Sequence, residues 1–324
     1  MSPFPKQEEI ALGEDGMGYA LRMATMNGLT FHDLARHLAS PGHLSLPASS
    51  INAIAFMFGC PPESLRNAFV VRHFRAGSQA AYFLGHLFLK TYLLRQARPQ
   101  LCPVCVGLHG RARAAWSVSL LTACVFHGAR LIDRCVCSRP ILWRRPSIDL
   151  CECGLRLTDE HQGARPADTR ELSVSGQIEY LLGSGYVDVS ALPINTFPEG
   201  FGNVTIDTFI RLIWIFGMVG DLQIDEHPKS TNRRLQTVDA SVVACLAYDR
   251  LSAATSSSYP ARRMRLVGNA LCNLYDDVST PADATLISSL ASRLQELSAS
   301  PSIPRLIKKN RQLSLFEDDH GPIP

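Results

Sequence analysis

The chain has 324 residues, of which 46% are hydrophobic and 19% are charged, so it can bury a sizeable core and is not a disordered chain. This length allows about two or three domains. The formal net charge of +3 is too small to identify a polyanion-binding protein, so a basic surface has to be sought locally.

The N-terminal residues 1–16 include acidic side chains and lack the apolar region of a signal peptide, so we expect no export and a reducing compartment. The two most apolar segments, residues 80–94 and 204–220, are interrupted by charged side chains and fall short of the roughly 20 apolar residues of a membrane span. We expect both segments to be buried helices, and no membrane partner.

Residues 1–98 are predicted to form an N-terminal helical domain. In residues 31–38 the apolar side chains recur at helical spacing, and Thr30 is a plausible N-cap. Residues 49–71 predict a short helix, a turn at Gly59 and a second helix beginning at Pro61–Glu63. This outline is typical of a helix-turn-helix, which we favour over the alternative of a generic helical hairpin. If the pair binds DNA, Arg66 is the basic residue on its second helix.

Residues 101–154 hold seven of the ten cysteines, arranged mostly in close pairs. In a reducing compartment such a cluster is more typical of a metal site than of disulfides. One CxxC pair and one CxxH pair complete a tetrahedral Cys3His set, and two CxC pairs complete an all-cysteine set. Full protein coordination leaves no open position for catalysis, which indicates structural zinc. The predicted ligands of two Zn²⁺ ions are Cys102, Cys105, Cys124 and His127, and Cys135, Cys137, Cys151 and Cys153.

The double zinc-binding module is therefore placed at residues 99–157. A redox CxxC would need a thioredoxin-like context that is missing around Cys102. Because CxC is tighter than CxxC, the second ligand set stays open: one sulfur of Cys135 and Cys137, or a partner such as His109, could exchange roles. Three further cysteines, Cys60, Cys245 and Cys272, lie alone in apolar helical patterns and are expected in the core.

Positive charge accumulates in this module. Residues 95–156 contain ten arginines, no lysine and three carboxylates, a local net charge of +7. Arginine pairs with phosphate through its planar fork, so a surface that follows a DNA backbone is predicted, although some of these arginines could instead pair with neighbouring carboxylates. The expected contact point is residues 142–146, "LWRRP". The predicted DNA-binding residues are Arg66, Arg111, Arg113, Arg144 and Arg145.

Residues 158–172 are predicted to be a linker, because they are polar and contain glycine and proline. Helical apolar spacing then recurs in residues 173–185, 204–220, 239–251, 261–278 and 283–297, which predicts a C-terminal helical domain over residues 173–302. The fold class is thus mainly α. No phosphate loop, HExxH or GxSxG motif occurs, so we expect no enzymatic activity.

The tail, residues 303–324, is predicted to be disordered. It contains Gln312, Leu313, Leu315 and Phe316 in the order Gln-Leu-x-Leu-Phe, which resembles the peptide that binds the bacterial sliding clamp. A final helical turn that docks its leucines on the bundle is an equally supported alternative.

With the order CPxC, Trp116, CxxHG, "LIDRC" and CxCG established, the segment resembles the TniQ family of transposition proteins. Residues 14–38 resemble the opening helices of that family, with Asn27–Gly28–Leu29 at their turn. Two departures stand out: Gly18–Tyr19 replaces a common Ser-Trp pair, and CVC replaces CxxC. The resemblance covers residues 14–185 well and the remainder loosely.

The resemblance implies a DNA-binding protein that selects or marks the target of transposition and connects it to the AAA+ ATPase and the transposase. It implies a bacterial, cytoplasmic, nucleoid-associated protein. A stand-alone zinc-containing transcription regulator is the alternative, and a third hypothesis is an adaptor whose target is chosen by an RNA-guided complex. The sequence does not distinguish a monomer from a homodimer.

Overall fold

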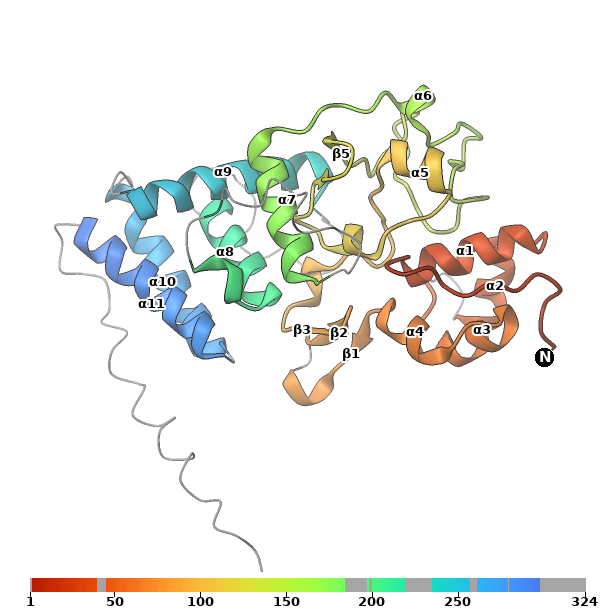
Figure 1. Ribbon diagram of the computed structural model, residues 1–324, viewed down its shortest axis with the longest axis horizontal. Helices are drawn as coiled ribbons and strands as arrows, with labels where there is room; N and C mark the ends of the chain where they lie inside the picture. The colour runs from red at the N-terminus through yellow and green to blue at the C-terminus, as the bar shows by residue number, and fades with distance from the viewer. Residues whose placement is uncertain are drawn as a thin grey trace, which may run out of the picture.

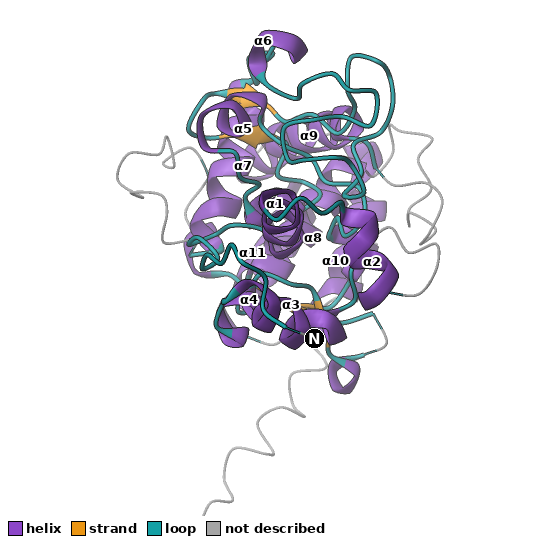
Figure 2. Cartoon of the chain, turned by 90° about the vertical axis from the view of Figure 1, so that its right-hand side faces the viewer, coloured by secondary structure: helices purple, strands orange, loops and turns teal. Residues whose placement is uncertain are grey.

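The computed structural model describes residues 2–39, 45–77, 79–183, 197, 200–218, 235–256, 261–278 and 280–297. In Figure 1 the described part is elongated, with the N-terminal helices at one end and the C-terminal helices at the other. The cysteine-rich region lies between them. Figure 2 gives the view along this long direction, in which most of the chain is helical, as the sequence predicts.

The N-terminal end consists of four short helices, each with an identifiable start or stop. These helices are α1 (Gly16–Met26), α2 (Phe31–Leu38), α3 (Ile51–Phe58) and α4 (Pro62–Asn67). Asp15 caps α1 by accepting hydrogen bonds from two backbone N–H groups, and Thr30 and Asp33 form a capping box on α2. Gly59, with φ of 73°, ends α3 in the left-handed region. The predicted helix–turn–helix outline is therefore confirmed for α3 and α4 at the level of secondary structure.

The predicted buried helix over residues 80–94 is wrong. Strands β1 (Val71–Arg72), β2 (Ala81–Phe83) and β3 (His86–Phe88) form an antiparallel sheet there, followed by a 3₁₀ turn, η3 (Thr91–Leu93). Phe83 pairs with His86 across the two-residue turn Leu84–Gly85, whose φ angles of 52° and 80° are both positive. Two such residues make the primed hairpin turn that suits strand twist, and glycine adopts it readily. A segment that is apolar almost throughout does not separate strand from helix by periodicity.

The cysteine-rich region has little regular structure. It contains the short helix α5 (Pro103–His109), the 3₁₀ turn η4 (Ala114–Ser117) and the hairpin of β4 (Ala123–Cys124) and β5 (Ala129–Arg130). Trp116 and Trp143 are both 1% exposed and fill its interior. Most of its backbone is held by turns and isolated bridges, such as that between Leu101 and Ile132. Other interactions are needed to fix such a region.

Residues 158–172 are not a free linker. They include helix α6 (Asp159–Gln162), and Pro166 forms a bridge with Ala129 of β5. Helix α7 (Thr169–Leu181) begins four residues before the predicted helix, with a capping box between Asp168 and Glu171. The polar composition that suggested a linker supplies these caps instead.

The C-terminal helices confirm the predicted elements, in α8 (Ile206–Met218), α9 (Thr237–Ser256), α10 (Ala261–Asp277) and α11 (Pro281–Leu297). Helix α8 is buried over most of its surface and packs closely on α9, where the Cα of Gly217 lies against Val243. The short η6 turn (Phe201–Asn203) precedes α8. None of the described helices combines the length and apolar character that crossing a membrane requires.

A polar network joins the C-terminal helices to the cysteine-rich region. The Thr237 backbone N–H donates to Asp133 over 2.9 Å, and its hydroxyl donates to Gln100 over 2.8 Å. The Gln100 amide in turn donates to the carbonyls of Trp116, Val118 and Leu121. Buried apolar side chains from α1 to α11 form one contiguous cluster. The predicted domains thus share a core within the described residues.

Candidate metal centres

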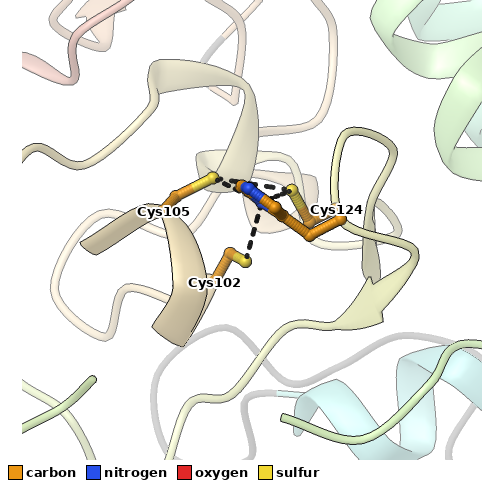
Figure 3. A group of neighbouring side chains, drawn as sticks. Cys102, Cys105 and Cys124 are labelled. Atoms are coloured by element: carbon orange, nitrogen blue, oxygen red, sulfur yellow. Dashed lines mark hydrogen bonds between the residues drawn. The ribbon is translucent and has the colours of Figure 1, made fainter. Parts of the chain in front are cut away.

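The residues of the first predicted ligand set lie close together within the cysteine-rich region. Cys102 is the N-cap of α5, Cys105 lies in its first turn, and Cys124 ends β4. Figure 3 shows the three labelled sulfur atoms facing a common centre, between helix α5 and the β4–β5 hairpin. His127 lies on the turn of that hairpin, just before Gly128, whose φ is 58°. Together with the sulfur atoms, its ring completes a cluster whose ligand atoms all lie within 4.8 Å of one another.

The distances in this set fit tetrahedral coordination. The His127 Nδ1 atom lies 3.7, 3.2 and 3.5 Å from the Sγ atoms of Cys102, Cys105 and Cys124. The Sγ atoms of Cys105 and Cys124 are 3.6 Å apart. Four ligands at the bond lengths of a tetrahedral zinc site lie about 3.5–3.8 Å from one another, a range that holds three of these four distances, while the Cys105–His127 distance is shorter.

Hydrogen bonds among the sulfurs of this set favour a thiolate at Cys124, and the pKa values of Cys105 and Cys102 are raised. Hydrogen bonds from the Cys102 and Cys105 thiols lower the pKa of Cys124, and the His127 backbone N–H also donates to its sulfur. Cys102, Cys105 and Cys124 are all buried. Because buried anionic sulfurs are costly without a cation, the donor chemistry and the geometry both suit a bound metal ion.

The second ligand set is built from two tight turns of the same shape. Cys135 and Cys137 lie on one turn, and Cys151 and Cys153 lie on the other. The residue after each pair, Ser138 or Gly154, has a positive φ of 67° or 86°. The Sγ atoms are 3.8 Å apart for Cys135 and Cys153, and 3.9 Å for Cys137 and Cys151. The short CxC spacing is therefore compatible with a four-sulfur cluster.

This second set is the predicted one, and His109 lies outside both clusters. A hydrogen bond from the Leu155 backbone N–H lowers the pKa of Cys153 to about 7. Within the described residues, the two clusters are the groups of cysteine, histidine or carboxylate side chains that could hold a metal ion.

Gln162, on helix α6, contacts the second ligand set, and no sequence pattern indicated this role. Its amide Nε2 lies 3.6 Å from the Cys135 Sγ atom, and its Oε1 accepts a hydrogen bond from the Val136 backbone over 3.0 Å. Gln162 also donates to the Arg156 carbonyl. Such contacts orient metal ligands. The segment was assigned as a linker, and no spacing pattern connects a glutamine there with a cysteine 27 residues earlier.

Most of the arginines in the cysteine-rich region have partners. Five of the ten in residues 95–156 form ion pairs, all with carboxylates in the described part of the chain. The pairs are Arg95–Asp133, Arg113–Glu179, Arg130–Glu171, Arg144–Glu152 and Arg156–Asp149. The alternative that these arginines pair with neighbouring carboxylates is thus confirmed for half of them. The local net charge of +7 overstates the charge available to a ligand.

Arg145 lies inside the molecule, at 1% exposure, and its burial excludes it as a surface contact. Its guanidinium donates to the carbonyls of Leu142, Ser147 and Ile148, and its carbon lies 5.1 Å from the centre of the Trp143 ring. Burial lowers the pKa of Arg145 to about 10. The loop "LWRRP" therefore folds around its second arginine, and the expected contact point is mostly interior.

The other predicted DNA-binding arginines lie on different parts of the surface. Arg66 is exposed on α4, and Arg111 is exposed just after α5, elements that are well separated in Figures 1 and 2. Arg113 is half-buried against Glu179 and lies over the Phe126 ring at 4.3 Å. Arg144 is exposed and paired with Glu152. The predicted clamp-binding residues, Gln312 to Phe316, lie outside the described residues.

One comparison with known proteins gives a match. The family model for TniQ matches residues 9–131, which run from the segment before α1 to the end of the β4–β5 hairpin. No curated protein gave a significant match to the chain. The matched segment contains the Asn27–Gly28 turn and all four residues of the first ligand set, the features that carried the resemblance. The match to residues 9–131 supports the resemblance of this part of the chain to the TniQ family of transposition proteins.

Proposed function

We propose that this protein is a non-enzymatic adaptor of DNA transposition, which selects or marks the target site and connects it to the AAA+ ATPase and transposase of the mobile element. The observation that carries the proposal is the TniQ match, which ends just after the first ligand set. What is known of the family supplies the role in target selection. A stand-alone transcription regulator is the weaker proposal, because it is supported only by the helix-turn-helix outline and the metal clusters.

The metal clusters are proposed to be two structural Zn²⁺ sites. Thiolate and imidazole donors in a tetrahedral set suit zinc. Each cluster supplies four protein ligands, so no position is left for a substrate or an activated water. When bound, the ions would supply the cross-links that the irregular backbone of residues 101–157 lacks.

Contact with DNA is proposed at the exposed arginines that have no carboxylate partner among the described residues. Arg111, next to α5, is the strongest candidate of the original set, and Arg66 on α4 is the second. Their guanidinium groups can pair with phosphates, and such contacts would make binding sensitive to salt. Whether the target is recognised directly or through an RNA-guided complex is decided by the affinity of the protein alone for duplex DNA.

The test is co-purification of the full chain with the AAA+ ATPase of the same mobile element, with and without duplex DNA. We expect the ATPase to be retained on the wild-type protein. Metal content of the same material, by elemental analysis, is expected to be two zinc ions per chain. A metal-loaded, folded protein that retains neither the ATPase nor DNA would refute the adaptor role. For substitutions of the ligand cysteines, the matched control is the Cys245→Ser variant, at a cysteine outside both clusters.

A further inference from the structure

The β1–β3 hairpin sheet directly follows α3 and α4 and is fixed to them. The Leu84 backbone N–H, in the β2–β3 turn, donates to the Asn67 carbonyl at the end of α4 over 2.9 Å. The opposite end of the sheet, the β1–β2 loop, points away from this attachment and lies at the lower edge of the molecule in Figure 1. The loop is thus held on a fixed stem.

Aromatic side chains are exposed on this loop and at its base. Phe74, at the start of the 3₁₀ turn η2 (Phe74–Ala76), is 76% exposed, and Tyr82 of β2 is 43% exposed. The His73 ring packs against Tyr82, with ring centroids 4.8 Å apart. Neither Phe74 nor the exposed face of Tyr82 forms part of the hydrophobic core. Together they form an apolar and aromatic surface beside which a flat ring system can pack.

The charged side chains of the loop and of strand β1 are all positive. Arg75 is exposed next to Phe74, and no carboxylate among the described residues pairs with it. Arg72 at the end of β1 donates to Thr91. From Ser64 to Ile132 the sequence contains nine arginines or lysines and no aspartate or glutamate. Arg95, Arg113 and Arg130 of this stretch pair with carboxylates from other segments, but the loop itself carries no negative side chain.

These features select the class of partner. An exposed ring beside an unpaired guanidinium suits DNA, since an apolar side chain can enter between base steps while a cation pairs with the phosphate next to them. A protein partner would need an apolar surface that also carries carboxylates. In Figure 1 the loop and α4 both lie along the lower edge of the molecule, so a duplex that runs along this edge could meet both.

We propose that the β1–β2 loop is a DNA-contacting wing, in which Phe74 packs against bases and Arg75 pairs with a backbone phosphate. This surface is separate from the arginines of the metal region, so it adds a contact that the proposed adaptor role does not require.

The test measures binding of the full, metal-loaded chain to a random-sequence DNA duplex by fluorescence anisotropy at several salt concentrations. Phe74→Ala is expected to weaken binding about tenfold with little change in the salt dependence, because it removes stacking and no charge. Arg75→Ala is expected to reduce the slope of log affinity against log salt by about 0.9, as for one lost phosphate contact.

Matched controls separate these effects from general ones. Leu12→Ala removes an apolar side chain that is also 76% exposed, and Arg36→Ala removes an exposed arginine from α2. Wing variants that bind like these controls, while Arg111→Ala weakens binding, would overturn the wing and leave the adaptor proposal standing. Loss of ATPase binding with unchanged DNA binding would also overturn it and assign the loop to a protein contact.

Discussion

Asp15 is a buried carboxylate whose titration should be visible in the stability of the protein. It is 3% exposed, caps α1 by accepting from the Met17 and Gly18 backbones, and accepts from the Ser117 hydroxyl over 2.8 Å. Burial nevertheless raises its pKa from 3.8 to about 6. We predict that Asp15→Asn, which keeps an oxygen for the two backbone donors, stabilises the protein at neutral pH.

The size and sign of this effect follow from linkage. A rise in pKa from 3.8 to about 6 corresponds to about 3 kcal/mol against the ionised form in the folded state. The folded protein binds this proton more tightly than the unfolded chain does. The stabilisation by the protonated group is therefore complete below pH 3.8 and is lost as the pH rises through about 6. Asparagine mimics the protonated form, so the variant should gain about 2–3 kcal/mol at pH 7 and nothing at low pH.

The assay is denaturant unfolding of the two proteins at a series of pH values with the same metal concentration. Protonation of the thiolates releases metal from both proteins alike, so the difference between the two curves isolates Asp15. Asp33→Asn is the matched control. Hydrogen bonds from Thr30 lower the pKa of Asp33, so this substitution should destabilise the protein at neutral pH where Asp15→Asn stabilises it. Parallel curves for wild type and Asp15→Asn between pH 4 and 7 would refute the reasoning, since the folded pKa would then be ordinary.

Three further predictions concern packing, an ion pair and the metal clusters. Gly217→Ala should destabilise the protein by about 1–3 kcal/mol, because its Cβ would meet the Val243 backbone of α9, and a fall in thermal midpoint would measure this. Glu171→Ala should destabilise the protein by about 3–5 kcal/mol in denaturant unfolding. The fully buried Glu171 carboxylate pairs with Arg130 over 2.8 Å and so joins α7 to β5. A loss of stability below about 1 kcal/mol would contradict this. Cys105→Ser and Cys151→Ser should yield insoluble protein, or folded material with reduced zinc content, because metal binding is coupled to folding; soluble variants that keep two ions per chain would contradict it.

Helix starts and stops could be predicted because their signals lie within a few residues of the structure they control. Thr30 is the N-cap that the sequence suggested, and Gly59 ends α3 as its place in the sequence indicated. The metal ligands behave in the same way, since each pair sits on one turn or one helical start. The departure at Gly18–Tyr19 has a tertiary cause instead, which no local pattern shows. A Cβ at Gly18 would meet Ala112 at 2.9 Å, and the Tyr19 hydroxyl donates to Glu8.

The β2–β3 hairpin could not be separated from a helix by its apolar content. The distinguishing signals were weak, namely the Leu84–Gly85 turn and the alternation of buried Ala81 and Phe83 with exposed Tyr82. Leucine is an uncommon residue at positive φ, so this turn does not carry the usual Asn-Gly signature. The pairing of three short strands is a tertiary outcome that overrode a locally ambiguous sequence.

The arginines mark the limit of inference from composition. Arg113 pairs with Glu179, 66 residues away, and Arg130 pairs with Glu171, 41 residues away. A count over residues 95–156 includes the cations and omits these distant carboxylates, so it overestimates the exposed charge. Metal ligands can be predicted from the spacing of their cysteines, whereas an ion pair between distant segments follows no spacing in the sequence. Charge that has no carboxylate partner among the described residues, as at Arg75 and Arg111, is therefore the more reliable guide to a DNA surface than the net charge of a segment.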